Sequence, residues 1–99
     1  MEHRGYDIVE LARKSGKIKK GTNEVTKYLE RGTAKAVVYA ADVNPKEIIM
    51  HLPLLAKEKG ILCIEVPSKE ELGAAAGLTK PTAAVAIIDA GDAANMLKE

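Results

Sequence analysis

Three short apolar runs separated by amphipathic segments restrict the fold of this chain more than any other feature. The runs are Ala34 to Ala41, Ile61 to Val66 and Ala83 to Ile88. The first is nearly continuous in apolar residues and rich in β-branched ones, which is typical of a strand covered on both faces of its sheet. Between the runs, apolar residues recur at helical spacing. This alternation predicts an α/β domain with helices on both faces of a mixed sheet.

The size and composition of the chain point to one small domain over residues 1–99. Its 99 residues are enough for one hydrophobic core and too few for two. Phe and Trp are absent, so Ala, Val, Ile and Leu must build the core, and the aromatic platforms on which single-strand binders stack bases are mostly missing. The one cysteine, Cys63, lies in an apolar run and is interpreted as a buried structural thiol.

Start and stop signals place two helices and a short strand in the first third of the chain. A helix is expected from Tyr6, with Ser15-Gly16 as its end. Lys17 to Lys19 alternates polar and apolar residues, which predicts a brief edge strand with both lysines on its outer face. Thr22 is expected to cap the next helix, which ends at Arg31-Gly32.

A third helix is expected after the first apolar run. Asn44 is its predicted cap and Pro45 its first residue, because proline is tolerated where no backbone donor is needed. The pattern continues to about Lys59, and Pro53 within it predicts a kink or a local break.

Two further helices complete the expected alternation. Ser68 with Glu71 three residues later has the spacing of a capping box. That helix is short, since Gly73 to Gly77 contains only glycine and alanine, and these small residues suggest close packing on a neighbour. After the third apolar run, a final helix of one or two turns is expected through Met96 and Leu97.

Charge is segregated along the chain although the net charge is only +1. The segment from Arg13 to Lys35 holds eight basic and two acidic residues, and the rest of the chain is net acidic. Such a distribution indicates a directional anion-binding face. The alternative is a solvated surface with chance clustering.

One carboxylate and one amide lie inside this basic segment. Lys27 comes four residues after Asn23 and three after Glu24, so these side chains project from the same exposed side of the first helical turns. The unpaired N–H groups and the positive end of the helix dipole attract an anion there. Electrostatic attraction to phosphate needs only cations, so the Asn23-Glu24 pair is interpreted as a reader of hydrogen-bond donors.

Catalytic and metal chemistry find no support in the sequence. Gly16 to Thr22 has the gap of a phosphate-binding loop but lacks the lysine before the hydroxyl residue, and a helix is predicted before it. His3 and His51 have no ligand partners at metal-binding spacing. Glu70-Glu71 is explained by the preference of carboxylates for a helix start. We therefore expect no enzyme activity, no metal and no cofactor.

Three blocks of this sequence, in order, resemble the ribosomal protein L-seven-Ae family. They are GKIKKGTNEVTK, AADVNPKEIIMHLPLLAKEKGI and VPSKEELGAAAGLTKPTAAVAII, which together cover nearly the whole chain. The resemblance implies a three-layer α-β-α sandwich that binds RNA kink-turns, in the ribosome and in box C/D and H/ACA guide ribonucleoproteins. The expected partners are therefore RNA and other ribonucleoprotein proteins, with no membrane and a monomer when free. The expected location is the cytoplasm, or the nucleolus or nucleus in a eukaryote.

The resemblance also implies two RNA-contacting regions. In the first, Glu24 accepts from the guanine N–H donors of sheared G·A pairs, while Asn23 and Lys27 donate to guanine O6, in agreement with their hydrogen-bonding groups. Phosphates are then held by the lysines and the helix start, at Lys19, Lys20 and Gly21, with Arg31 as a weaker candidate. The second region grips an extruded nucleotide and maps to Asn44, Ile48, Lys69, Leu78, Thr79 and Lys80.

The second region departs from the pattern of the family. Relatives often have an acidic residue in place of Asn44, and many archaeal ones have an acidic-then-apolar pair where this chain has Thr79-Lys80. Ile48 and Leu78 could instead be plain core residues. A protein-interaction scaffold without sequence-specific RNA reading is the alternative function.

Overall fold

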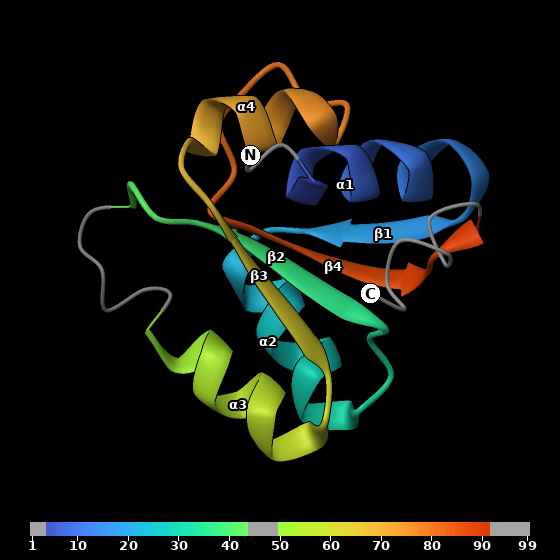
Figure 1. Ribbon diagram of the computed structural model, residues 1–99, viewed down its shortest axis with the longest axis vertical. Helices are drawn as coiled ribbons and strands as arrows, with labels where there is room; N and C mark the ends of the chain where they lie inside the picture. Colours follow the sequence, from blue (N-terminus) through green and yellow to red (C-terminus); the bar gives the residue numbers. More distant parts are fainter. Residues whose placement is uncertain (1–3, 44–49, 92–99) are drawn as a thin grey trace.

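In the part of the chain that the structure describes, four strands form one mixed sheet between two pairs of helices (Figure 1). The computed structural model describes residues 4–43 and 50–91. Within them the elements follow the order α1 (Arg4–Ser15), β1 (Lys17–Lys20), α2 (Thr22–Arg31), β2 (Ala36–Ala40), α3 (His51–Lys59), β3 (Leu62–Val66), α4 (Lys69–Ala75) and β4 (Ala84–Asp89). The predicted α/β class and three-layer sandwich are confirmed.

The strand order in the sheet is β1-β4-β2-β3. β2 and β3 are parallel, joined by a crossover through α3, whereas β4 runs antiparallel to both β1 and β2. β2 and β4 are the inner strands, which explains why their residues are almost all buried and apolar. β1 is an edge strand, as predicted, and its three lysines discourage further strand pairing there.

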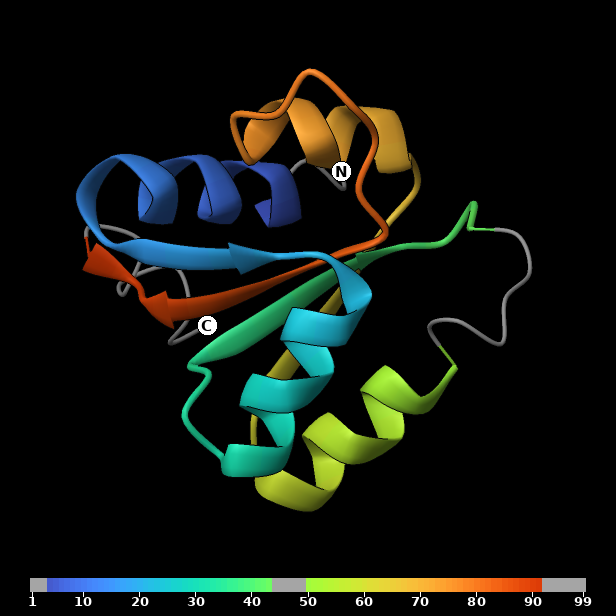
Figure 2. The ribbon, with the colours of Figure 1, turned by 180° about the vertical axis from the view of Figure 1, so that it is seen from behind.

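The two faces of the sheet are covered by different helix pairs. α1 and α4 lie together on one face, and α2 and α3 lie together on the other (Figures 1 and 2). Each pair is joined across its seam by a hydrogen bond: the Thr26 hydroxyl lies 2.7 Å from His51 Nε2, and Ser68 N–H donates to the Tyr6 hydroxyl at 2.9 Å. His51, the one imidazole among the described residues, therefore has a structural partner.

The predicted cap of α2 is wrong by one residue. The N-cap is Gly21, with φ 97° and ψ 144°, and Thr22 is the first residue of the helix. The chain turns sharply out of β1 here, and a residue with a Cβ rarely adopts such a positive φ. The Gly21 carbonyl accepts from Val25 N–H at 2.9 Å, while its own N–H donates to Ala84 at 3.0 Å. Backbone hydrogen bonds of Gly21 therefore take the place of a side-chain cap.

Other helix boundaries differ in detail from the expectation. α1 begins at Arg4, two residues before Tyr6, with Gly5 buried against the side chains of Val66 and Ile64. Pro53 is the third residue of α3, in a first turn whose N–H groups lack intrahelical acceptors, so it does not interrupt that helix. The predicted start of the third helix at Asn44 and the final helix through Leu97 lie outside the described residues.

The predicted cap of α4 is confirmed, although one of its two hydrogen bonds has a different partner. Ser68 Oγ accepts from Glu71 N–H at 3.2 Å, as a capping box requires. The Ser68 N–H, which the box would give to Glu71, donates to Tyr6 instead. Gly73 touches the backbone of the following loop, since a Cβ built there would lie 2.1 Å from the Lys80 carbonyl oxygen. The small residues of this helix do serve close packing.

Candidate nucleic-acid interface

The first two turns of α2 present an exposed polar group made of Asn23, Glu24 and Lys27, here called the α2 polar group. All three side chains are exposed. Glu24 Oε2 lies 3.9 Å from Lys27 Nζ, and the two side chains keep 48% and 51% of their surface exposed. An exposed pair of this kind contributes only about 0–1 kcal/mol, so a ligand can replace either partner at little cost. Glu24 is therefore accessible to a ligand.

The amphipathic pattern of α2 fixes the direction of these side chains. Val25 and Leu29 are fully buried against the sheet, so the residues on the opposite side of the helix must face solvent. The turn at Gly21 is tied to β4 through its hydrogen bond with Ala84. The start of α2 is thus held rigidly, with its unpaired N–H groups beside Lys20, the exposed last residue of β1.

The basic segment seen in the sequence is divided by the fold into two groups. Lys20 pairs with Val85 at the start of β4, whereas Lys17 pairs with Asp89 at its end, so the two lysines lie at opposite ends of the sheet. Arg13 donates through Nε to the Ala75 carbonyl at 3.2 Å, and Lys14 lies 3.9 Å from a Glu10 carboxylate oxygen. Residues at the C-terminal end of α1 therefore support α4 or pair locally, and they lie away from the α2 polar group.

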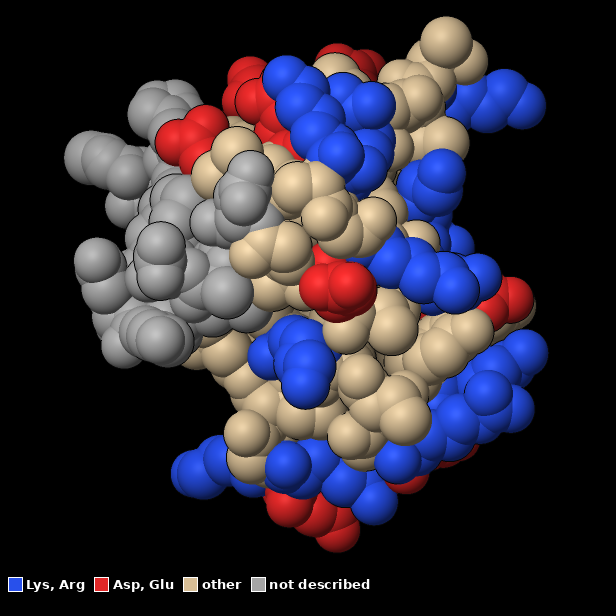
Figure 3. Space-filling view, turned by 90° about the vertical axis from the view of Figure 1, so that its right-hand side faces the viewer, with Lys and Arg blue, Asp and Glu red and all other residues tan. Residues whose placement is uncertain are grey.

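Positive side chains nevertheless follow the side of the molecule on which α2 lies. In Figure 3 Lys and Arg form a broken band along the right-hand edge, which is the side that faces the viewer in Figure 2. Lys19, from β1, is half-buried with its Nζ 5.9 Å from the ring centre of Tyr28. Arg31, at the last residue of α2, is exposed.

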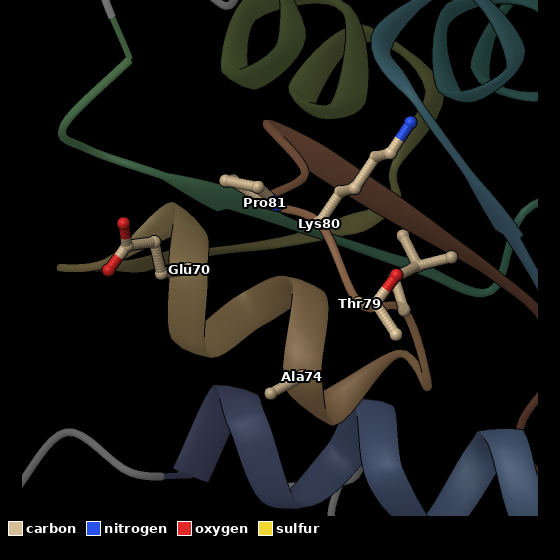
Figure 4. Close-up of a pocket in the computed structure, with 6 residues that line it drawn as sticks. Glu70, Ala74, Thr79, Lys80 and Pro81 are labelled. Carbon is tan, nitrogen blue, oxygen red and sulfur yellow. The ribbon is translucent and has the colours of Figure 1, made fainter.

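The second predicted region is only partly described by the structure. Asn44 and Ile48 lie outside the described residues. Thr79 and Lys80 are exposed, whereas Leu78 is half-buried and packs against the core, in part as the core interpretation predicted. A hollow of about 250 Å³ is lined by Glu70, Ala74, Leu78, Thr79, Lys80 and Pro81 (Figure 4). The Lys80 amine points away from Glu70 in this view.

The fold brings the described parts of both regions to the same end of the sheet. β1 ends there at Lys20, and β4 begins there at Ala84, a few residues after Lys80. Lys69, which is half-buried, starts α4 at this end, and its N–H donates to the Asp42 carboxylate at 2.9 Å. Sequence reasoning missed Asp42, because a hydrogen bond to a residue 27 positions away leaves no local pattern.

The described part of the chain shows no feature for metal binding or for crossing a membrane. Among residues 4–43 and 50–91, His, Cys, Asp and Glu form no cluster of three or more that could hold a metal ion. Over the same part of the chain, no helix combines the length and the apolar character needed to cross a bilayer.

Burial raises the pKa of the half-buried Cys63 thiol to about 11, and the charge of Glu65 acts in the same direction. Because the thiolate is the reactive form, we expect alkylation by iodoacetamide at pH 8 to be about 100-fold slower in the folded protein than in urea. The folded-state rate should rise roughly tenfold per pH unit until the pH approaches the raised pKa. Equal rates in the folded and unfolded protein at pH 8 would contradict a shielded thiol.

The fold and site define a class of small three-layer α-β-α proteins that present polar and basic side chains where an edge strand meets the start of a helix. Residues 3–97 match the model of the Ribosomal protein L7Ae/L30e/S12e/Gadd45 family, and the chain belongs to this family. The predicted resemblance is thus confirmed.

A solved structure supports the assignment. The Giardia lamblia 15.5kD RNA binding protein is similar to this chain, with 33% sequence identity and a TM-score of 0.81. The match covers 98% of this chain and 79% of the Giardia protein.

Proposed function

We propose that this chain is a non-enzymatic RNA-binding protein that recognises kink-turns through their sheared G·A pairs. In this role it is a structural component of the ribosome, an assembly platform for box C/D or H/ACA guide ribonucleoproteins, or both, and it acts in the cytoplasm or, in a eukaryote, the nucleolus or nucleus. The observation that carries the proposal is the exposed Glu24 carboxylate within a basic surface at the start of α2.

The α2 polar group has the hydrogen-bonding groups that a sheared guanine requires. Shearing leaves guanine N1–H and O6 without their Watson–Crick partners. The ionised carboxylate of Glu24 has acceptors and no donor, so it accepts hydrogen bonds from the guanine N–H groups. Asn23 and Lys27 donate hydrogen bonds to O6. The Lys27–Glu24 pair is long and half-exposed, so exchanging it for contacts to guanine costs little.

The lysines and the backbone around α2 provide the electrostatic part of binding. Regular A-form RNA has a major groove too narrow for side chains, so a helix can enter only where the duplex is distorted. Lys20 and the N–H groups after Gly21 hold phosphates at this entrance and set the orientation of α2. Base contacts by the α2 polar group then supply specificity.

The loop before β4 supplies a second contact in this proposal. Lys69 and Lys80 hold backbone phosphate, while Leu78 and Thr79 border the hollow of Figure 4 beside an extruded nucleotide. Asn44 and Ile48 complete the region. Its support is the placement of Lys69, Thr79 and Lys80 at the same end of the sheet as Lys20.

A mobility-shift titration tests the proposal directly. The probe is an RNA duplex with a kink-turn carrying tandem G·A pairs, and the control is the same RNA with those pairs changed to Watson–Crick pairs. We expect the kink-turn to bind at least tenfold more tightly at fixed salt, equivalent to about 1.4 kcal/mol. Equal affinity for the two RNAs would overturn kink-turn recognition and leave a general polyanion-binding surface.

Replacing Lys20 by alanine tests the phosphate-holding role. We expect Lys20→Ala to weaken binding of both RNAs by a similar factor and to reduce the slope of log K against log salt by about 1, because one phosphate contact is lost. Lys59→Ala, which removes an exposed lysine at the end of α3, is the matched control and should change neither quantity. A loss restricted to the kink-turn would instead assign Lys20 a base contact.

One observation favours the scaffold alternative. Met50 and Leu54, one helical turn apart at α3, keep 62% and 73% of their surface exposed and form a neighbouring apolar pair. Such a pair suits a protein partner. Co-purification of a partner after nuclease treatment, from protein that fails to distinguish the two RNAs above, would favour this alternative.

A further inference from the structure

The two edges of the sheet differ in how they are protected against further strand pairing. β1 carries three lysines, and its register with β4 is irregular between Lys17 and Ile18. Charged residues and such irregularities are the usual means of blocking an edge strand. β3, at the other edge, pairs in regular register with β2 and contains neither lysine nor proline. β3 therefore lacks the protection that β1 has.

The backbone of β3 has donors and acceptors left over on its outer side. The Val66 carbonyl accepts from Ala41 N–H at 2.7 Å, so the polar groups of Val66 face inward. Backbone groups alternate in direction along a strand, and those of Cys63 and Glu65 therefore face away from β2. Among residues 4–43 and 50–91, no hydrogen bond reaches these outward groups. In Figure 1 β3 crosses in front of β2, where one more strand can join the sheet.

The side chains along this edge define what kind of strand would fit. Ile64 and Val66 lie against Gly5, so they point to the face of the sheet that α1 covers. Leu62 shares this face by alternation and keeps 36% of its surface exposed, so an added strand should be apolar here. Glu65 points to the opposite face, is exposed, and forms no ion pair with the described part of the chain. A basic residue on that side of the added strand would meet an unpaired carboxylate.

A hollow lies at the end of the same edge. Its volume is about 340 Å³, and it is lined by Ala41, Glu65, Val66 and Pro67. Lysine and arginine can lay their methylene groups along apolar surface while the charged end stays at a polar group. The hollow therefore has room for a long basic side chain, with the Glu65 carboxylate as the partner of its charge.

The position of α3 separates two possible occupants of this edge, a second copy of the chain and an extended peptide. α3 packs on β3 from one face of the sheet. Neighbouring strands lie about 4.8 Å apart, so a second copy joined through its own β3 would bring its α3 about that close to this one. Packed helices need about 8–10 Å between their axes. A peptide strand has no helix over it and meets no such obstacle.

We propose that the β3 edge is a docking site for an extended segment of a partner protein, which joins the sheet antiparallel to β3. Apolar residues of the segment cover Leu62 and Ile64, and they alternate with lysine or arginine, one of which pairs with Glu65. Main-chain hydrogen bonds to Cys63 and Glu65 supply affinity, and the alternating side chains supply specificity. The antiparallel direction is favoured because its ladder is slightly more stable per residue.

This docking site is independent of the proposed RNA interface. β3 lies at the front of the sheet in Figure 1, whereas β1 and α2 lie at the front in the opposite view of Figure 2. A partner at β3 therefore leaves the start of α2 open to RNA. The site also differs from the exposed pair Met50 and Leu54, which belongs to α3. Failure of kink-turn recognition would not affect it.

A synthetic peptide tests the docking site by calorimetry. The probe is a capped seven-residue peptide in which lysine and valine alternate, with lysine at both ends. In an antiparallel pair, the probe residues opposite Cys63 and Glu65 turn their N–H groups toward β3 and share the face of Glu65, so these residues are the lysines. Methylating the lysine backbone nitrogens should weaken binding about tenfold or more, and methylating the valine nitrogens should change it by less than about twofold. Equal effects of the two methylations, or no saturable binding up to about 1 mM, would overturn the proposal.

Substitutions at Glu65 test the same contact from the protein side. Glu65→Pro removes an outward N–H and no hydrogen bond between β2 and β3, because proline is tolerated on an edge strand. It should weaken binding of the probe about tenfold or more. Glu65→Gln keeps the N–H and loses only the charge, so a loss of about three- to fivefold with a flatter salt dependence is expected. Glu58→Gln, at an exposed glutamate of α3, is the control and should bind the probe as the unaltered protein does.

Amide hydrogen exchange gives a readout that needs no substitution. In the free protein the N–H groups of Cys63 and Glu65 should exchange quickly, whereas that of Ile64, which faces β2, should exchange slowly. A probe concentration of about ten times its Kd should slow Cys63 and Glu65 about tenfold and leave Ile64 unchanged. Slow exchange of Cys63 and Glu65 without the probe would show that the edge is already covered and would overturn the proposal. If that slow exchange disappeared on dilution of the protein, the occupant would be a second copy.

Discussion

Replacing Glu24 by alanine should weaken kink-turn binding by about 1–3 kcal/mol, the cost of losing a base-edge contact. The sign of this effect is informative. Removing an exposed negative charge from a basic surface should strengthen binding to any polyanion, if attraction were purely electrostatic. The predicted weakening therefore requires that the carboxylate accept hydrogen bonds from the RNA. Titrations with the kink-turn and with its Watson–Crick control, at the same salt concentration, measure the change in affinity for each RNA.

Glu30→Ala is the matched control for this change. Glu30 is exposed on the same helix and carries the same charge, but it lies outside the α2 polar group. Its removal should leave kink-turn binding unchanged or slightly tighter. Glu24→Ala should also bind the Watson–Crick control RNA slightly more tightly, since only the charge matters there. If Glu24→Ala and Glu30→Ala gave the same result on both RNAs, the base-reading role of Glu24 would be wrong.

Local patterns were sufficient to predict most elements of this fold. The apolar runs became β2, β3 and β4, and the stops at Gly32 and Gly60, both at positive φ, ended α2 and α3. These features depend on the residues within one or two turns, so a short window of sequence contains their cause. Ser68 as the cap of α4 belongs to the same group.

Features that depend on strand pairing could not be predicted in this way. Thr22 has the side chain of a good cap, but the antiparallel pairing of β1 with β4 forces the turn that only Gly21 makes readily. The basic segment looked continuous in sequence, yet the length of β1 separates Lys17 from Lys20 and sends them to opposite ends of the sheet. The α2 polar group was predicted correctly as an exposed unit because it lies within a single helix.

The loop that carries Thr79 and Lys80 packs closely against Gly73 of α4. This contact predicts a large loss of stability when Gly73 is replaced by alanine. Gly73 is buried within α4, where alanine would ordinarily stabilise a helix by about 1 kcal/mol over glycine. A Cβ at this position, however, would lie 2.1 Å from the Lys80 carbonyl oxygen and 3.1 Å from Pro81 Cα, and neither backbone atom can move as a side-chain tip does. The steric term should therefore exceed the helical preference.

We expect Gly73→Ala to lower the free energy of unfolding by about 1–2 kcal/mol, because overpacking costs up to about 3 kcal/mol and the helical preference of alanine offsets about 1 kcal/mol of it. Urea denaturation measures it, as a lower midpoint with an unchanged slope. Ala74→Gly, at the exposed neighbouring position, is the control: it should cost about 1 kcal/mol through helical preference alone. Helical preference alone predicts opposite signs for the two substitutions, because they exchange the same residues in opposite directions. The clash with Lys80 reverses the sign for Gly73→Ala, so that both variants should be less stable. A stabilised Gly73→Ala protein would show that the loop can move away from α4, and the hollow of Figure 4 would then lose its rigid wall.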